Sequence, residues 1–145
     1  MDKSYLNPTQ ESGRELYQKN IKGQVIMLNL LRFREIADYT ETPELAPINP
    51  ISGEDAYQLY IEQTLPFLKK TGGEILFLGQ GGLFFVGPTN ERWDSVLMIR
   101  QNSIEDFFAF ANNQEYLKVI GHRRASLEDS RILPLTQNKS YEICV

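Results

Sequence analysis

Two patterns of apolar and polar residues alternate along the chain, one typical of buried strands and the other of amphipathic helices. The segment 25–33 is almost continuously apolar, and only Asn29 and Arg32 interrupt it. A strand with one solvent-facing side would alternate strictly between apolar and polar residues. This segment does not, so we expect a strand whose two faces are both covered. The segment 93–100 is similarly apolar and predicts a second strand of this kind.

The segment after Ser52 predicts a long helix. Its apolar residues, Tyr57 and Tyr60 among them, recur at helical spacing, and Gly72–Gly73 end the pattern. Ser52 is a favourable residue for the N-cap. Because Pro66 lies inside the pattern, we expect the helix to kink there or to end its first half.

Further helices are predicted in the second half of the chain and near its start. Ser103 caps a phenylalanine-rich helix, which breaks near Asn112–Asn113. A second helical stretch, Glu115–His122, follows this break. A short helix begins after Thr9 and makes residues 1–20 an N-terminal helical extension.

The remaining strands are shorter. Glu74–Leu78 predicts a strand, and Gly79–Gly82 predicts a bulge or tight turn before Leu83–Val86. Ser130–Leu135 reads as the final strand. Residues 136–145 form a tail whose SYEICV segment could add an edge strand.

This order of elements predicts one α+β domain, 1–145, with its core at 24–135. After the helical extension the order is β–α–β–β–α–β, which is the ferredoxin-like arrangement of a four-stranded antiparallel sheet with two helices on one face. The other face of the sheet would be bare in a monomer. Because the first and third strands are apolar throughout, we expect a symmetric homodimer that pairs these sheet faces.

Composition narrows the classes of partner. The chain has 145 residues, 41% of them hydrophobic, and a net charge of −4, which argues against a nucleic-acid-binding surface. A single cysteine, Cys144, excludes an intramolecular disulfide and a cysteine metal cluster. No apolar run approaches the roughly 20 residues of a membrane span, and the N-terminus lacks the apolar core of a signal peptide. We expect a cytoplasmic protein with no membrane partner, no metal and no cofactor.

The densest group of charged residues lies at 121–134 and contains the only histidine, His122. Imidazole titrates near neutral pH, so His122 could act as a general base. It could also ligate haem or simply end a helix. The three arginines here could bind a carboxylate or an enolate, or could pair with Glu128 and Asp129; they are Arg123, Arg124 and Arg131.

Several polar and aromatic residues are candidates for substrate binding. Asn29 and Arg32 are three positions apart in a strand, so they should point to opposite faces, and one would enter a pocket beside the helices. Tyr57, Tyr60 and Trp93 could line an aromatic pocket, or could be core residues.

The chain also resembles a known family over residues 24–135. The resemblance rests on MLNLLRFRE (27–35) with Ala37–Tyr39, AYQLY (56–60), GGEILFLG (72–79), RWDSVLMIR (92–100), FFAFANNQEY (107–116) and HRRASLEDSRILP (122–134). These segments are similar to domain-of-unknown-function family 1330, within the dimeric α/β-barrel superfamily. The resemblance implies a ferredoxin-like protomer and a barrel-forming dimer. That superfamily includes cofactor-free monooxygenases, isomerases and haem-binding proteins with a pocket between the helices and the sheet.

Two hypotheses for function follow. In the first, the protein is a small-molecule enzyme of the cofactor-independent oxygenase or isomerase type, in which His122 is the acid/base and Arg123 or Arg131 stabilises an anion. In the second, a non-catalytic dimer binds a small ligand or a protein. A cavity in front of His122, with an arginine and a tyrosine close by, would favour the enzyme.

Overall fold

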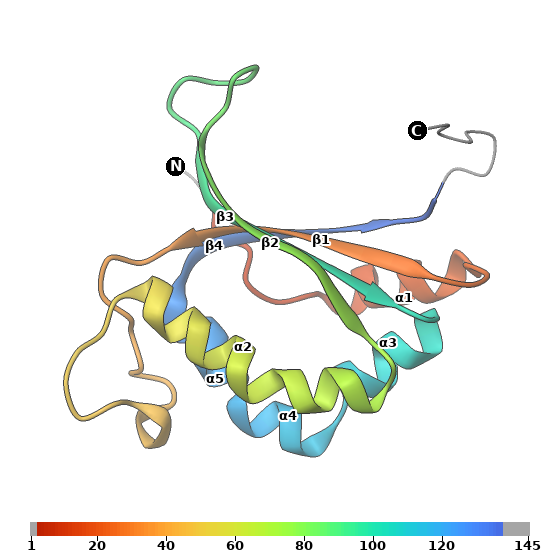
Figure 1. Ribbon diagram of the computed structural model, residues 1–145, viewed down its shortest axis with the longest axis horizontal. Coiled ribbons are helices and arrows are strands. Elements are labelled where there is room, and N and C mark those ends of the chain that lie inside the picture. The colour runs from red at the N-terminus through yellow and green to blue at the C-terminus, as the bar shows by residue number, and fades with distance from the viewer. Residues whose placement is uncertain (1–2, 138–145) are drawn as a thin grey trace.

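The computed structural model describes residues 3–137 and shows one antiparallel sheet with helices packed on one of its faces (Figure 1). The strand order is β2-β3-β1-β4. The strands are β1 (Val25–Phe33), β2 (Glu74–Leu83), β3 (Arg92–Gln101) and β4 (Leu127–Leu135). With helices between β1 and β2 and between β3 and β4, this is the ferredoxin-like topology, and the predicted α+β fold class is confirmed.

Three of the five α-helices within the described residues begin at the predicted caps. The α-helices are α1 (Gln10–Gln18), α2 (Gly53–Lys70), α3 (Ile104–Ala111), α4 (Gln114–Val119) and α5 (Gly121–Ser126), with a short 3₁₀ helix η1 (Pro43–Leu45) in the loop before α2. The side chains of Thr9, Ser52 and Ser103 each accept a hydrogen bond from a backbone N–H in the first turn of α1, α2 and α3. None of the helices within residues 3–137 is long and apolar enough to cross a membrane.

Side chains of the central strand β1 alternate between the helix-covered face of the sheet and its outer face. Val25, Met27, Asn29 and Leu31 are buried beneath the helices, and the residues between them are only partly buried. The main core cluster joins sheet and helices. It consists of Leu31, Tyr57, Tyr60, Leu68, Leu97, Phe110, Tyr116 and Leu127. In the protomer, therefore, one face of β1 is covered and the other remains partly exposed.

The predicted turn at Gly79–Gly82 is wrong, because β2 runs through these glycines to Leu83. The sheet instead shifts register between Ile75 and Phe77, and the chain reverses after Leu83. A Cβ at Gly81 would lie 2.3 Å from the carbonyl oxygen of Trp93. This glycine thus permits close approach of β2 and β3 rather than a turn.

Helix α2 runs through Pro66 to Lys70 and ends just before Gly72–Gly73, where the pattern predicted its end. Other boundaries differ from the sequence prediction. The last helical region extends beyond His122 to Ser126, and β4 begins at Leu127 instead of Ser130. The proposed edge strand at 140–145 lies outside the described residues.

Candidate functional site

The loop between β1 and α2, residues 34–52, lies against α5. The backbone N–H of Arg34 donates to the carbonyl of Ser126 at 2.9 Å, and the N–H of Asp38 donates to the carbonyl of Ala125 at 2.8 Å. These bonds satisfy backbone groups at the C-terminal end of α5. They join the long predicted loop to the segment that contains His122.

His122 is buried behind this loop, with 3% of its surface exposed. Its Nδ1 lies 2.7 Å from the hydroxyl oxygen of Tyr39, and the two rings meet edge to face. Burial lowers the pKa of His122 and raises the pKa of Tyr39, so both groups are uncharged near neutral pH. The imidazole tautomer decides which of the two groups donates, and in either case this hydrogen bond fastens the loop to α5.

This pair predicts a loss of stability in mild acid. The pKa of His122 in the folded protein lies below the ordinary 6.5, so the unfolded chain binds this proton first. The stability that neutral His122 contributes is therefore fully present above the pKa of this residue in the unfolded chain. It is lost as the pH falls through the pKa of His122 in the folded protein. Denaturant unfolding at about pH 7.5 and about pH 5 measures the decrease, before most carboxylates protonate.

The variant His122→Asn keeps an uncharged polar group near the position of Nδ1 and removes the titration. We expect it to lose less stability than the wild type between these two pH values. An equal loss in both proteins would contradict the role given to His122.

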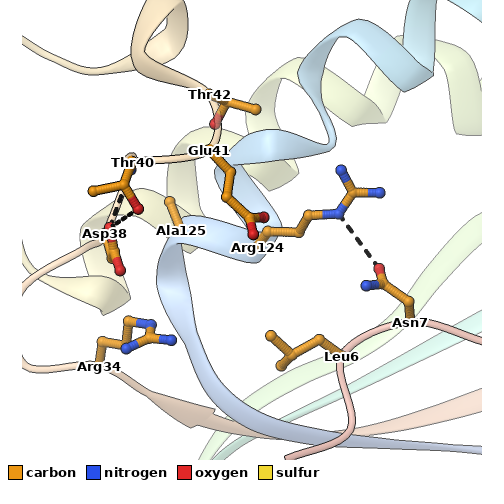
Figure 2. A pocket seen from close by; sticks show the side chains of 9 residues that line it. All are labelled: Leu6, Asn7, Arg34, Asp38, Thr40, Glu41, Thr42, Arg124 and Ala125. Atoms are coloured by element: carbon orange, nitrogen blue, oxygen red, sulfur yellow. Dashed lines mark hydrogen bonds between the residues drawn. The ribbon is translucent and has the colours of Figure 1, made fainter.

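A pocket of about 220 Å³ opens beside the His122–Tyr39 pair (Figure 2). Its walls come from the N-terminal segment, the 34–52 loop and α5. The lining residues are Leu6, Asn7, Arg34, Asp38, Thr40, Glu41, Thr42, Arg124 and Ala125. His122 is not among them. Arg124, two residues further along α5, does line the pocket, and so do Asp38 and Thr40 on either side of Tyr39. The histidine therefore supports the wall of this pocket and does not face into it.

The two arginines of the pocket form no ion pair with a carboxylate among residues 3–137. The Nε of Arg34 is shielded from solvent and has no hydrogen-bond partner there. The Nε of Arg124 donates only a long bond, 3.4 Å, to Asn7. An unpaired buried donor costs about 1–3 kcal/mol. These guanidinium groups are consequently available to an acceptor that enters the pocket.

The acidic side of the pocket is held in place by its own loop. The carboxylate of Asp38 accepts hydrogen bonds from the backbone N–H and the hydroxyl of Thr40, at 3.0 and 2.8 Å. These bonds, with a smaller contribution from the charge of Arg34, lower the pKa of Asp38. Asp38 is therefore an exposed carboxylate that Thr40 orients and that lies close enough to Arg34 for the two charges to interact.

Arg123 points into the protein interior, away from the pocket lining. It is 6% exposed, and its guanidinium donates to the carbonyl of Leu6 and to the hydroxyl of Ser130. The hydroxyls of Tyr60 and Tyr116 lie 2.7 Å apart in the same interior. Burial raises the pKa of Tyr57, which the nearby Arg123 opposes. The interior thus holds a guanidinium among neutral phenols.

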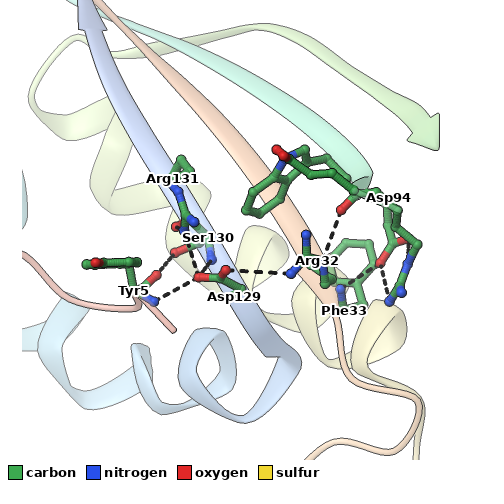
Figure 3. A network of polar contacts seen from close by, with 10 residues as sticks. Tyr5, Arg32, Phe33, Asp94, Asp129, Ser130 and Arg131 are labelled. Carbon is green, nitrogen blue, oxygen red and sulfur yellow. Dashed lines mark hydrogen bonds and ion pairs between the residues drawn. The ribbon is translucent and has the colours of Figure 1, made fainter. Parts of the chain in front are cut away.

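A second polar network surrounds Asp129 (Figure 3). One carboxylate oxygen accepts from the backbone N–H groups of Tyr5 and Ser130 and from Arg131, each at 2.8 Å. The other oxygen lies 3.6 Å from Arg32. The Arg131 side chain also stacks on Tyr5, at 4.8 Å from its ring centroid. The network lowers the pKa of Asp129 and joins the N-terminal segment to β4.

The predicted site residues therefore do not form one site. Arg32, Arg131 and Trp93 come together, because both guanidinium groups lie within 5.0 Å of the Trp93 ring centroid. Tyr57, Tyr60 and Arg123 share the interior. Asn29 is buried and donates to the carbonyls of Met27 and Leu97, both at 3.2 Å. Arg131 pairs with a carboxylate as one hypothesis expected, whereas Arg123 pairs with none among the described residues.

Sequence reasoning missed Arg34, Asp38 and Tyr39 as site residues. The only signal was the length of the loop that contains them, since loops of this size are often functional. In the described part of the chain, no three His, Cys, Asp or Glu side chains gather in a way that could hold a metal ion.

Comparisons with known proteins agree with this fold. No protein-family model and no curated protein matches the chain. The crystal structure of methylated RPA0582 protein superposes with a TM-score of 0.84 at 29% identity, covering 96% of this chain and 98% of the other. A second structure of RPA0582, from Rhodopseudomonas palustris, gives 0.83 at 29% identity, covering 94% and 99%. RPA0582 is described as a protein of unknown function.

A more distant structure is a dimeric ferredoxin-like protein of unknown function from Thermobifida fusca. It has 14% identity and a TM-score of 0.41, with 79% of this chain and 92% of the other covered. Membership in domain-of-unknown-function family 1330 stays a prediction, because no family model matches.

Proposed function

We propose that this protein is a homodimeric small-molecule-binding protein whose binding site is the pocket between the 34–52 loop and α5. The observation that carries the proposal is the pair of pocket arginines, Arg34 and Arg124, which form no ion pair among the described residues. Four of the six other arginines do form such pairs. Arg32, Arg92, Arg100 and Arg131 each lie within 4.0 Å of a carboxylate. Unpaired guanidinium groups in a pocket favour a bound acceptor such as a carboxylate.

The construction of the pocket supports a binding role over catalysis by His122. The only described hydrogen bond of the His122 ring joins Nδ1 to Tyr39, a residue of the loop itself. This contact orders the loop that supplies most of the pocket lining. His122 and Tyr39 therefore act as positioning residues, and family 1330 membership, proposed on the resemblance, adds no active site.

The dimer is proposed from the outer face of the sheet. Residues on the uncovered side of β1 and β3 include Ile26, Leu28, Leu30, Val96 and Met98, and the facing positions of the edge strands are Phe77 and Leu133. Phe77 is 54% exposed and Leu133 is 55% exposed. The β2–β3 hairpin projects beyond this face, and Phe85 near its tip is fully exposed (Figure 1). An apolar surface of this extent favours a protein partner, and a second copy supplies a matching one.

Native mass spectrometry tests the binding role, on dimer purified gently from its own host. We expect one small molecule retained per protomer. The double variant Arg34→Gln/Arg124→Gln removes both unpaired charges, each worth about tenfold or more in affinity if it binds a charged acceptor. We expect it to lose the molecule.

The matched control is Arg14→Gln, a change at an exposed arginine of α1. It should retain the molecule. Retention by the double variant, or an empty wild-type protein that also binds nothing in a screen of small metabolites, would contradict the proposed function.

A further inference from the structure

The charged groups around the pocket have both signs. Arg34 and Arg124 contribute two positive charges, and Asp38 and Glu41 contribute two negative charges. Figure 2 shows Arg34 and Asp38 on one side of the pocket and Arg124 on the other. A ligand with charge of one sign would therefore meet a like charge in the lining, whereas a ligand that carries both charges can pair with both signs.

Each sign has unused bonding capacity. Asp38 uses one oxygen, Oδ1, for its bonds from Thr40, and its Oδ2 makes no hydrogen bond within residues 3–137. The Arg34 side chain forms no hydrogen bond there either, and its terminal nitrogens, unlike the buried Nε, are not shielded from solvent. An ammonium group can donate to the free carboxylate oxygen, and a carboxylate can accept from the guanidinium groups.

The size of the pocket limits the ligand to a small metabolite. Its volume of about 220 Å³ lies below the roughly 300–1,000 Å³ of sites for drug-sized ligands. The lining includes only two apolar side chains, Leu6 and Ala125, and the rest is polar or charged. A compact, highly polar molecule fits this wall better than an aromatic or aliphatic one.

Resting on the proposed function, we propose that the ligand is a small zwitterion of the α-amino acid type. Its carboxylate binds a guanidinium group of the lining, and its ammonium group binds Asp38. The hydroxyls of Thr40 and Thr42 are further donors and acceptors at the pocket wall. The net charge of this ligand matches the balanced charge of the site.

Isothermal titration calorimetry tests the proposal with matched probes. The twenty standard amino acids are titrated first, followed by the deaminated carboxylate and the decarboxylated amine of the tightest binder. We expect one-to-one binding of at least one amino acid and a loss of at least about tenfold for each fragment, because each lacks one charged contact. In Asp38→Asn the advantage of the amino acid over its deaminated carboxylate should disappear, while Arg14→Gln should bind as the wild type does.

The other outcomes separate this inference from the proposed function. Equal binding of the carboxylate fragment, or of the amine fragment, overturns the zwitterion and leaves a small-molecule pocket. If no amino acid binds but other metabolites do, the zwitterion is also overturned and the small-molecule pocket remains. If no probe and no metabolite binds the wild-type protein, both proposals fail.

Discussion

Replacing Gly53 by alanine is expected to destabilise the protein by about 3 kcal/mol. A Cβ at this position would lie 2.3 Å from the carbonyl oxygen of Arg34 and 2.5 Å from that of Ser126. Both atoms belong to the backbone, at the end of β1 and at the end of α5, so neither can rotate away. The N–H of Gly53 also donates to the Arg34 carbonyl at 3.0 Å, which fixes the close approach. The methyl group must therefore push α2 away from the sheet or from α5.

Thermal unfolding measures the effect of Gly53→Ala. A loss of this size lowers the midpoint by about 10 °C in a domain of this length. Gly13→Ala is the matched control, because Gly13 is also helical and no atom lies within 4 Å of its added Cβ. Alanine favours a helix over glycine by roughly 1 kcal/mol, so the control should be neutral or slightly stabilising. A Gly53→Ala protein as stable as the control would show that β1, α2 and α5 separate easily, and it would contradict this prediction.

Local signals in the sequence predicted most of the elements correctly. Thr9, Ser52 and Ser103 cap helices in the structure as their positions predicted, because an N-cap depends only on a few neighbouring residues. The apolar run of β1 also predicted a strand with a second apolar face. The errors came where contacts between segments that are distant in the sequence determine the local structure. Gly81 permits close approach of β2 to β3, which a turn pattern cannot reveal.

The candidate site was less predictable than the fold. His122 and its arginines stood out because charge density can be read along the chain. Their partners could not, since Tyr39 reaches His122 across 83 positions and Leu6 reaches Arg123 across 117. The side chains of Arg123 and Arg124 diverge, one toward the interior and one toward the pocket. Adjacent residues on a helix point in different directions, so a shared site was never implied by their adjacency.

The outer sheet face carries the other large expected effect. We expect Leu28→Glu to convert the proposed dimer into a monomer at micromolar concentration. Leu28 lies on the uncovered side of the central strand and faces Met98 on β3 and Leu133 on β4. By two-fold symmetry each substitution acts twice, and burying an unpaired carboxylate against an apolar partner costs several kcal/mol. The dissociation constant should rise at least about a hundredfold.

Sedimentation velocity over a dilution series measures this change, with circular dichroism to confirm that the protomer remains folded. Leu117→Glu is the control, because Leu117 is 43% exposed on α4, on the helix side of the sheet. It should leave the dimer intact, and Leu133→Glu on the outer face should weaken it. Leu28→Glu and Leu117→Glu add the same charge to opposite sides of the sheet. A difference between them therefore shows that the position on the outer face matters, and not the exchange of an exposed leucine for glutamate in general. A wild-type protein that sediments as a monomer at low micromolar concentration would remove the basis for the dimer, and the apolar outer face would then need another partner.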